Sequence, residues 1–234
     1  MNIHGDKLSG IKADILIHTA AIWLLPSVID AIIKTGVERI IAFGSTSVFG
    51  KTNSKNMYEQ QVVKKLENAE HSILSKSDLL NITIFRPTMI YGMGMDANIT
   101  RMTNTIRKFG FVAIYPPAKG LRHPVWAKDL ADAAISIIDN PKTYGKAYNL
   151  GGKTPITYHE MVKKIFIYLG KKPCIIGVPF LPFLLNIMGK LFPFIHINGE
   201  VATRMNQDLV FDMSSAKEDF DYHPHNFLEG DIIL

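Results

Sequence analysis

The sequence predicts an α/β protein: a parallel sheet flanked by helices, with a smaller, mostly helical C-terminal lobe. Three short apolar runs have the length and boundaries of buried strands: Ala13 to Thr19, Glu38 to Phe43 and Asn81 to Phe85. The segment after the first run has helical periodicity on one face, formed by Leu24, Val28, Ile32 and Ile33. A second helix is predicted over Glu59 to Lys76. Strands that alternate with helices form parallel sheets, because parallel neighbours need a long crossover.

A second lobe is predicted after the breaker-rich segment from Pro87 to Gly94. A helix from about Asn98 to Phe109 leads away from the alternating pattern. Residues 124–150 return to the sheet, with a helix over Lys128 to Asp139 and a strand at Ala147 to Leu150. We therefore expect a partial sheet domain over residues 1–92, rejoined by 124–150, and a lobe over 93–234 whose end, after Asn226, is loosely held.

The composition is that of a soluble globular protein, with 47% hydrophobic and 20% charged residues in a chain of 234. Lys and Arg exceed Asp and Glu by five but are scattered, so nucleic-acid binding is not expected. The single Cys174 forms no intramolecular disulfide, and Cys and His do not cluster at metal-ligand spacing. Without a signal-peptide pattern, a cytoplasmic protein with no metal is expected.

The most apolar tract runs from Val178 to Ile197 and is about long enough to cross a membrane. Pro and Gly interrupt it, so we expect short helical pieces and no transmembrane span. Such pieces suit a pocket cover, packing on a partner or attachment to a membrane surface. The apolar side chains available for attachment are Phe180, Leu184, Leu185, Ile187, Leu191 and Phe192.

Four short sequence motifs occur one after another along the chain. Gly5-Asp6 precedes a strand that ends in small residues, Asp14-Ile-Leu-Ile-His18-Thr-Ala-Ala21. A Ser-rich strand end follows, Phe43-Gly44-Ser45-Thr46-Ser47-Val48-Phe49-Gly50. The third segment is Ile84-Phe85-Arg86-Pro87-Thr88-Met89-Ile90-Tyr91-Gly92, and the fourth is Gly120-Leu-Arg122-His-Pro-Val125-Trp-Ala-Lys-Asp129-Leu-Ala131. Over nearly the whole chain, these segments resemble the extended short-chain dehydrogenase/reductase family, specifically its NAD-dependent nucleotide-sugar epimerase/dehydratase branch.

The resemblance implies a Rossmann-type sheet that binds NAD or NADP, and a substrate-binding lobe. Cofactor contacts are then expected at Asp6, His18, Thr19, Ala20, Ala21, Arg86 and Pro87. In the family, the residue that matches Ser45 donates a hydrogen bond to the reacting oxygen. The substrate implied is a nucleotide sugar, specifically a uridine-diphosphate sugar, with contacts at Ser47, Asn98 and Arg122. Arg suits a diphosphate because its planar fork of donors meets two phosphate oxygens.

The chain departs from the family where acid/base chemistry is expected. The family places Tyr-x-x-x-Lys on a helix, where the ammonium favours the phenolate. The predicted helix over 59–76 lacks this pair, and Val62 and Leu66 occupy the two positions when Ala69-Glu70 is aligned with the family's Ala-Glu. A second alignment puts Lys51 in place of the Tyr. Tyr58 with Lys65 is a displaced alternative, which leaves Tyr58 a candidate catalytic residue.

The family's opening strand and Gly-rich turn have no counterpart in this sequence. The strand at Ala13 corresponds to the fourth strand of the family's sheet and would present an apolar edge with unpaired backbone groups. We therefore expect an N-terminally truncated epimerase/dehydratase-like protein that self-associates or forms a homo-oligomer through that edge. The alternative is a non-catalytic nucleotide-sugar-binding or assembly protein.

Overall fold

The computed structural model describes residues 12–52, 54–191 and 198–234. The chain divides into two compact units. Unit 1 comprises Met1–Thr88, Asp129–Leu150 and Phe211–His223, and unit 2 comprises Met89–Lys128, Gly151–Val210 and Pro224–Leu234. The sequence-based division differs from this one at residues 89–92 and 124–128, which belong to unit 2, and at residues 211–223, which belong to unit 1 and were expected in the second lobe. Their helix packs on the last strand of the sheet, a contact between segments too distant in sequence for local periodicity to reveal.

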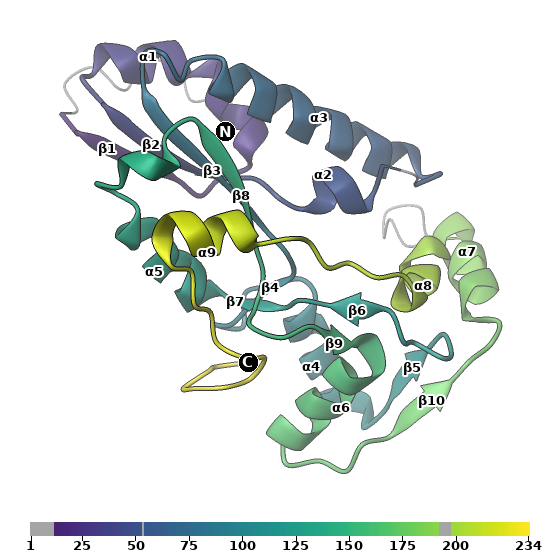
Figure 1. The fold of residues 1–234 in the computed structure, drawn as a ribbon. Coiled ribbons are helices and arrows are strands. Elements are labelled where there is room, and N and C mark those ends of the chain that lie inside the picture. Colours follow the sequence, from purple (N-terminus) through teal and green to yellow (C-terminus); the bar gives the residue numbers. More distant parts are fainter. Residues whose placement is uncertain (1–11, 53, 192–197) are drawn as a thin grey trace. The chain divides into compact units, whose positions relative to one another are not determined.

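Unit 1 contains the expected parallel sheet, now with observed bounds. Its strand order is β1-β2-β3-β8, formed by Ile15–His18, Arg39–Phe43, Asn81–Pro87 and Lys146–Leu150. All three pairings are parallel. The α/β prediction is confirmed, and the sheet is flanked by helices on both faces (Figure 1).

One face of the sheet carries the larger apolar core of unit 1. It is covered by η2 (Ile22–Ser27), α1 (Ile29–Lys34) and α3 (Met57–Leu74). Alternate residues of the central strands point into this core: Ile40, Ala42, Ile82 and Ile84. The predicted first helix is wrong in two respects: Pro26 lies in a separate 3-10 turn, and Leu25 is buried there while Leu24 is exposed.

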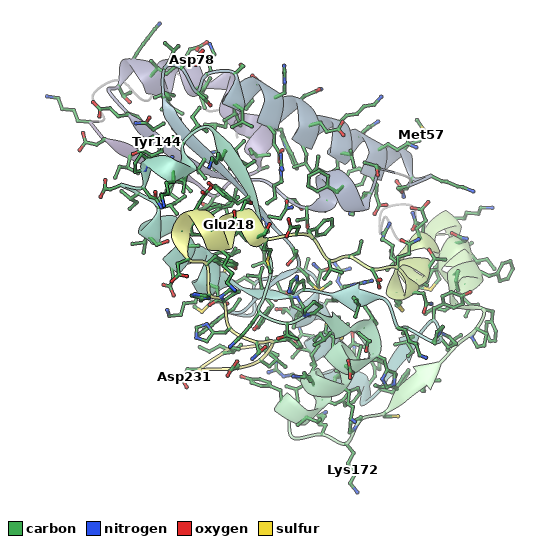
Figure 2. The ribbon with its side chains drawn as sticks, viewed as in Figure 1. Met57, Asp78, Tyr144, Lys172, Glu218 and Asp231 are labelled. Carbon is green, nitrogen blue, oxygen red and sulfur yellow. The ribbon has the colours of Figure 1, made fainter. Side chains whose placement is uncertain are left out.

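The other face is covered by α5 (Ala127–Ser136), η3 (Pro141–Thr143) and α9 (Ser214–Phe220). Phe220 of α9 packs 5.9 Å from the ring of Phe85 and 5.2 Å from that of Tyr148. The Tyr148 hydroxyl donates to the carboxylate of Asp219 at 2.6 Å. These contacts join α9 to the sheet. Figure 2 draws the side chains and labels Glu218 on α9.

Among its described residues, unit 2 combines helices with three two-stranded ladders. The helices are α4 (Ile99–Phe109), α6 (Tyr158–Tyr168), α7 (Leu181–Leu191), α8 (Glu200–Thr203) and η5 (Arg204–Asn206). The ladders pair β4 (Ile90–Tyr91) with β7 (Val125–Trp126), β6 (Leu121–Arg122) with β9 (Ile156–Thr157), and β5 (Val112–Ile114) with β10 (Ile175–Gly177).

The C-terminal segment was expected to be loosely held, and this prediction is wrong. Phe227, Ile232 and Leu234 are buried in the core of unit 2. The Tyr168 hydroxyl donates to the backbone carbonyl of Ile232, and Arg107 donates to that of Leu234 at 3.0 Å. Apolar burial and these long-range bonds fix a tail whose composition alone suggested fraying.

The apolar tract from Val178 forms α7, which begins after Pro179 and continues through Gly189. Residues 192–197 lie outside the described part of the chain. No helix among the described residues is long and apolar enough to cross a membrane.

Candidate functional site

The carboxyl ends of the strands in unit 1 bring three predicted segments to one edge of the sheet. In register, His18 lies beside Ala42, Phe43 beside Phe85, and Pro87 beside Leu150. The residues that follow β1, β2 and β3 therefore emerge at the same edge. Open α/β sheets bind their ligands at this edge, so it is the candidate site.

The segment after β1 offers short side chains at this edge. Thr19 and Ala20 are exposed, and Ala21 is half-buried. His18 is half-buried, with its Nε2 3.4 Å from the carbonyl oxygen of Ala21. Short side chains let a ligand approach the backbone, which fits the cofactor contact predicted for residues 18–21. Asp6, also predicted to contact the cofactor, lies outside the described residues.

Ser45 lies in the turn between β2 and α2 (Ser47–Gly50). Its Oγ accepts a hydrogen bond of 3.1 Å from the backbone N–H of Ser47. Thr46 ties the same turn to the end of β3, since both its N–H and its hydroxyl donate to the Pro87 carbonyl at 3.1 Å. The turn is thus anchored to two strands, and because Ser45 acts there as an acceptor, its hydroxyl hydrogen can be donated to a ligand.

Arg86 at the end of β3 is held by Glu70 of α3. Its Nε lies 2.9 Å from Glu70 Oε2 and 3.1 Å from Oε1, and its Nη2 lies 2.5 Å from Oε2. The guanidinium also lies over the ring of Phe49, with 5.1 Å between its Cζ and the ring centroid. The fork of this arginine, predicted to contact the cofactor, is therefore engaged by a carboxylate and an aromatic ring within unit 1.

The sequence did not identify Glu70 as the partner of Arg86. The sequence feature that could have indicated this pair is a glutamate on the apolar face of the predicted helix. In the structure Glu70 is 5% exposed and lies between the core residues Leu66 and Ile73. A buried carboxylate needs a charged or hydrogen-bonding partner. Gly44 completes the arrangement, because a Cβ at that position would lie 2.9 Å from Glu70 Oε1.

The α3 positions that the first alignment matches to the family's Tyr and Lys are apolar. Leu66 is 3% exposed and belongs to the core, and Val62 packs against that core. Tyr58 is 57% exposed, and Lys65 lies over the ring of Trp23, 5.9 Å from its centroid. Lys51, which the second alignment puts in place of the Tyr, forms an ion pair of 3.2 Å with Glu59.

The spacing Tyr-x-x-x-Lys does occur twice in unit 2, at Tyr115 to Lys119 and at Tyr168 to Lys172. Neither pair lies on a helical turn, since the first spans Pro116-Pro117 and the second runs past the end of α6. The hydroxyl of Tyr168 donates to the carbonyl of Ile232. The helical geometry that places an ammonium beside a phenol is therefore absent from both pairs.

Arg122, predicted to hold the diphosphate, is buried in unit 2. Its Nη1 donates to the carbonyls of Leu121 at 2.8 Å and Gln207 at 2.7 Å, and its Nη2 donates to the carbonyl of Arg204. Burial lowers the pKa of this guanidinium, which lies over the ring of Tyr158. The residue fastens the segment around η5 to β6.

Asn98, the other predicted substrate contact in unit 2, is exposed at the start of α4. Its side chain makes no capping hydrogen bond, while its backbone N–H donates to Asp96 at 3.0 Å. The same aspartate accepts from the backbone N–H and the hydroxyl of Thr100. Asp96 therefore caps the helix and leaves the Asn98 amide at the surface.

A sequence model of the NAD dependent epimerase/dehydratase family matches residues 12–151. The chain belongs to this family. A UDP-glucose 4-epimerase from Vibrio cholerae is 26% identical to this chain over 208 residues, which cover 84% of this chain and 62% of that protein. The chain thus spans less than two thirds of this relative's length.

A further similarity is to an NADH dehydrogenase alpha subcomplex subunit 9 from Arabidopsis thaliana, 27% identical over 113 residues, or 48% of this chain and 27% of that protein. Solved epimerase/dehydratase structures share the fold. MoeE5 in complex with UDP-glucuronic acid and NAD has a TM-score of 0.68 at 17% identity and covers 96% of this chain and 77% of its own. A dTDP-glucose 4,6-dehydratase from Bacillus anthracis has a TM-score of 0.64 at 15% identity, with 97% and 73% covered.

Proposed function

We propose that this chain binds a nucleotide sugar together with NAD or NADP, with the cofactor at the carboxyl edge of the sheet in unit 1. The observation that carries the proposal is the register of β1, β2 and β3, which brings residues 18–21, Ser45 and Arg86-Pro87 to one edge. The exposed, short side chains of Thr19 and Ala20 support cofactor contact there.

A uridine-diphosphate sugar is the ligand we propose for the substrate lobe. Two relatives support this choice: the Vibrio cholerae protein is a UDP-glucose 4-epimerase, and the MoeE5 structure contains UDP-glucuronic acid. Asn98, with its exposed amide, is a better candidate for direct contact than Arg122, whose donors are directed at three backbone carbonyls. Ser47, at the start of α2, is also a proposed sugar contact.

In this proposal, Ser45 donates its hydroxyl hydrogen to the reacting oxygen of the sugar and polarises it. Bound NAD or NADP would supply the hydride acceptor. Arg86 has a positioning role, because its pair with Glu70 fixes the end of β3 beside the Ser45 turn.

A second candidate is a family member that binds nucleotide sugars without turning them over. The buried Leu66 favours it, since no ammonium stands at that position of α3 to activate a phenol. Tyr58, at the surface of the same helix, is the remaining candidate for proton transfer on α3.

Calorimetric titration of the folded chain with NAD, NADP and UDP-glucose, each alone, tests the proposal. Cofactor binding at micromolar concentration that Thr19→Trp abolishes is the expected result, because the indole would fill the space left by short side chains. Ile135→Trp, at an exposed position of α5, is the matched control. Binding of none of the three ligands would refute the proposal.

Turnover separates the two candidate functions. With UDP-glucose and NAD, an enzyme produces an epimer or a reduced cofactor at a rate that Ser45→Ala lowers by two orders of magnitude or more. A binding protein takes up the same ligands, and its background rate does not respond to Ser45→Ala.

A further inference from the structure

The strand β1 lies at one edge of the sheet in unit 1. It pairs in parallel with β2, and no described strand pairs with its other side (Figure 1). Both of its isoleucines, Ile15 and Ile17, are exposed. From Ile15 to His18 the strand contains no Lys and no Pro, the residues with which proteins commonly protect a sheet edge from another chain. Among the described residues, this edge is therefore apolar and uncovered.

The hydrogen bonds between β1 and β2 determine which backbone groups face the uncovered edge. The carbonyl of Asp14 accepts from the backbone N–H groups of residues 38 and 39, at 3.0 Å and 3.2 Å, so the backbone of Asp14 points toward β2. Successive residues of a strand direct their N–H and C=O groups to opposite sides. Every second residue after Asp14 therefore points toward β2, and the residues between them, Ile15 and Ile17, direct their donors and acceptors away from it.

The edge formed by β8 differs, because the chain itself covers it. The side-chain amide of Asn149 donates to the backbone carbonyl of Asp212 at 3.2 Å, and the ring of Tyr148 packs 5.2 Å from that of Phe220 on α9. Pairing of β1 with β8 of another copy would also be heterologous, and repeated pairing of this kind extends without closing. Pairing of β1 with β1 is isologous and closes as a two-fold dimer. The β1 edge is thus the one that fits a second copy.

We propose that β1 pairs with β1 of a second copy in an antiparallel arrangement, which joins two four-stranded sheets into one continuous sheet. Opposite residues of a hydrogen-bonded antiparallel pair exchange both of their hydrogen bonds. With Ile15 opposite Ile17 of the partner subunit, and the reverse, every donor and acceptor that these residues direct to the edge is satisfied. Any other register of the same phase places only one isoleucine of each copy opposite an isoleucine.

The residues that flank the isoleucines fit this register. Leu16 lies opposite Leu16 of the partner subunit, on the two-fold axis. Asp14 lies opposite the partner subunit's His18, and an acidic and a basic side chain in directly opposite positions stabilise a strand pair. Lys12, the next charged residue, lies opposite the partner subunit's Ala20, so no like charges face each other along the strand. The strand is therefore complementary to itself in backbone groups, apolar side chains and charge.

Sedimentation velocity of the full chain tests the pairing, and we expect a reversible dimer in the micromolar range. Ile17→Pro removes an N–H that points to the uncovered edge and none that bonds to β2, so it should raise the dissociation constant of the dimer at least about tenfold. Ile17→Val is the matched control, because it keeps the N–H and the β-branched shape, and it should change this constant by no more than about threefold. Circular dichroism checks that both variants are folded.

A cysteine on the two-fold axis tests the register and does not depend on the proline variant. Leu16 and its counterpart would form a non-hydrogen-bonded pair with Cα atoms about 4.5 Å apart, within the range that a disulfide spans. In a Cys174→Ser background, which removes the single cysteine of the chain, Leu16→Cys should cross-link under mild oxidation at least about tenfold faster than Leu79→Cys. Leu79 is exposed before β3, so its variant reports on random collision.

Three results would overturn the proposal. A chain that remains a monomer throughout the micromolar range would mean that another part of the same chain covers the β1 edge, or that the edge serves a different protein. Equal dissociation constants for Ile17→Pro and Ile17→Val would mean that the dimer forms elsewhere. Cross-linking of Leu16→Cys no faster than that of Leu79→Cys would exclude the register. These measurements contain no nucleotide, so titration with NAD, NADP and UDP-glucose tests the proposed function separately.

Discussion

The pair between Arg86 and Glu70 makes an asymmetric prediction about stability. The Glu70 side chain is 6% exposed and that of Arg86 is 19% exposed. Removing one partner of a buried pair costs about 3–5 kcal/mol, because the other charge is left uncompensated. Arg86→Met strands the more buried carboxylate, so we expect a loss in this range. Glu70→Met strands a guanidinium that already reaches solvent and lies over Phe49, so about 2 kcal/mol is expected.

The double variant, with Met at both positions, should be less destabilised than the sum of the two single variants. An apolar pair of similar volume leaves no charge in the core, and the coupling should reach about 2–3 kcal/mol. Urea unfolding measures these differences from the midpoint and slope of the transition. A Trp126→Phe background leaves Trp23, next to α3, as the only tryptophan, so its fluorescence follows unit 1.

Two results would refute this reasoning. Additive single effects, within about 0.5 kcal/mol, would mean that the two side chains do not interact in solution. A larger loss for Glu70→Met than for Arg86→Met would mean that Arg86 is the more deeply buried charge. Either result would also remove the argument that Glu70 gives Arg86 a positioning role at the candidate site.

Three further predictions concern other parts of the chain. Arg122→Met should destabilise unit 2 by about 3 kcal/mol, since three partly buried carbonyls lose a charged donor. Arg122→Lys should restore less than half of this loss, and thermal unfolding followed by Trp126 fluorescence in a Trp23→Phe background measures both effects. Burial lowers the folded-state pKa of His123 below its ordinary value of 6.5, so its contribution to stability is complete above about pH 6.5 and is lost as pH falls toward the folded-state pKa. The temperature of the unfolding midpoint should therefore decrease as the pH is lowered from 7 to 5. His123→Gln should make this decrease smaller, and an unchanged dependence of the midpoint on pH would exclude His123 as its cause. Ile17→Lys should suppress self-association through β1, the edge strand of the described sheet, in which Ile17 is 40% exposed. A wild-type chain that already sediments as a single sharp monomer peak would contradict this prediction.

The central strands β2 and β3 could be predicted from sequence because their burial leaves continuous apolar runs. Residues 39–42 are all buried, and β2 was expected within one residue of its observed start. The ladders of unit 2 have only two or three residues per strand, so no periodicity exists to detect. The helix after β1 was misread because Leu24 fits a 3.6-residue period, whereas Pro26 confines this segment to a 3-10 turn.

Within the candidate site, positions were predictable and partners were not. Strand ends place Ser45 and Arg86 at the carboxyl edge, and strand ends follow from local pattern. Arg86 meets a residue 16 positions away, and Arg122 meets carbonyls 82 and 85 positions away. Contacts of this separation depend on packing between elements, so the sequence identified the arginines without indicating that carboxylate and carbonyl oxygens engage them.

The apolar residues at positions 62 and 66 bear on whether activity could be restored to α3. Leu66 lies in the core of unit 1 with Ile73 and Ala69, so its side chain stabilises the packing of α3 on the sheet. An ammonium at the same position would lose its hydration among apolar core residues, and Glu70, one helical turn further on, is already engaged by Arg86. The family's Tyr and Lys therefore cannot be reintroduced at 62 and 66 without loss of stability. Proton transfer in unit 1 must then rely on hydroxyl groups that the present packing leaves available, namely Tyr58 at the surface of α3 and Ser45 in the turn after β2.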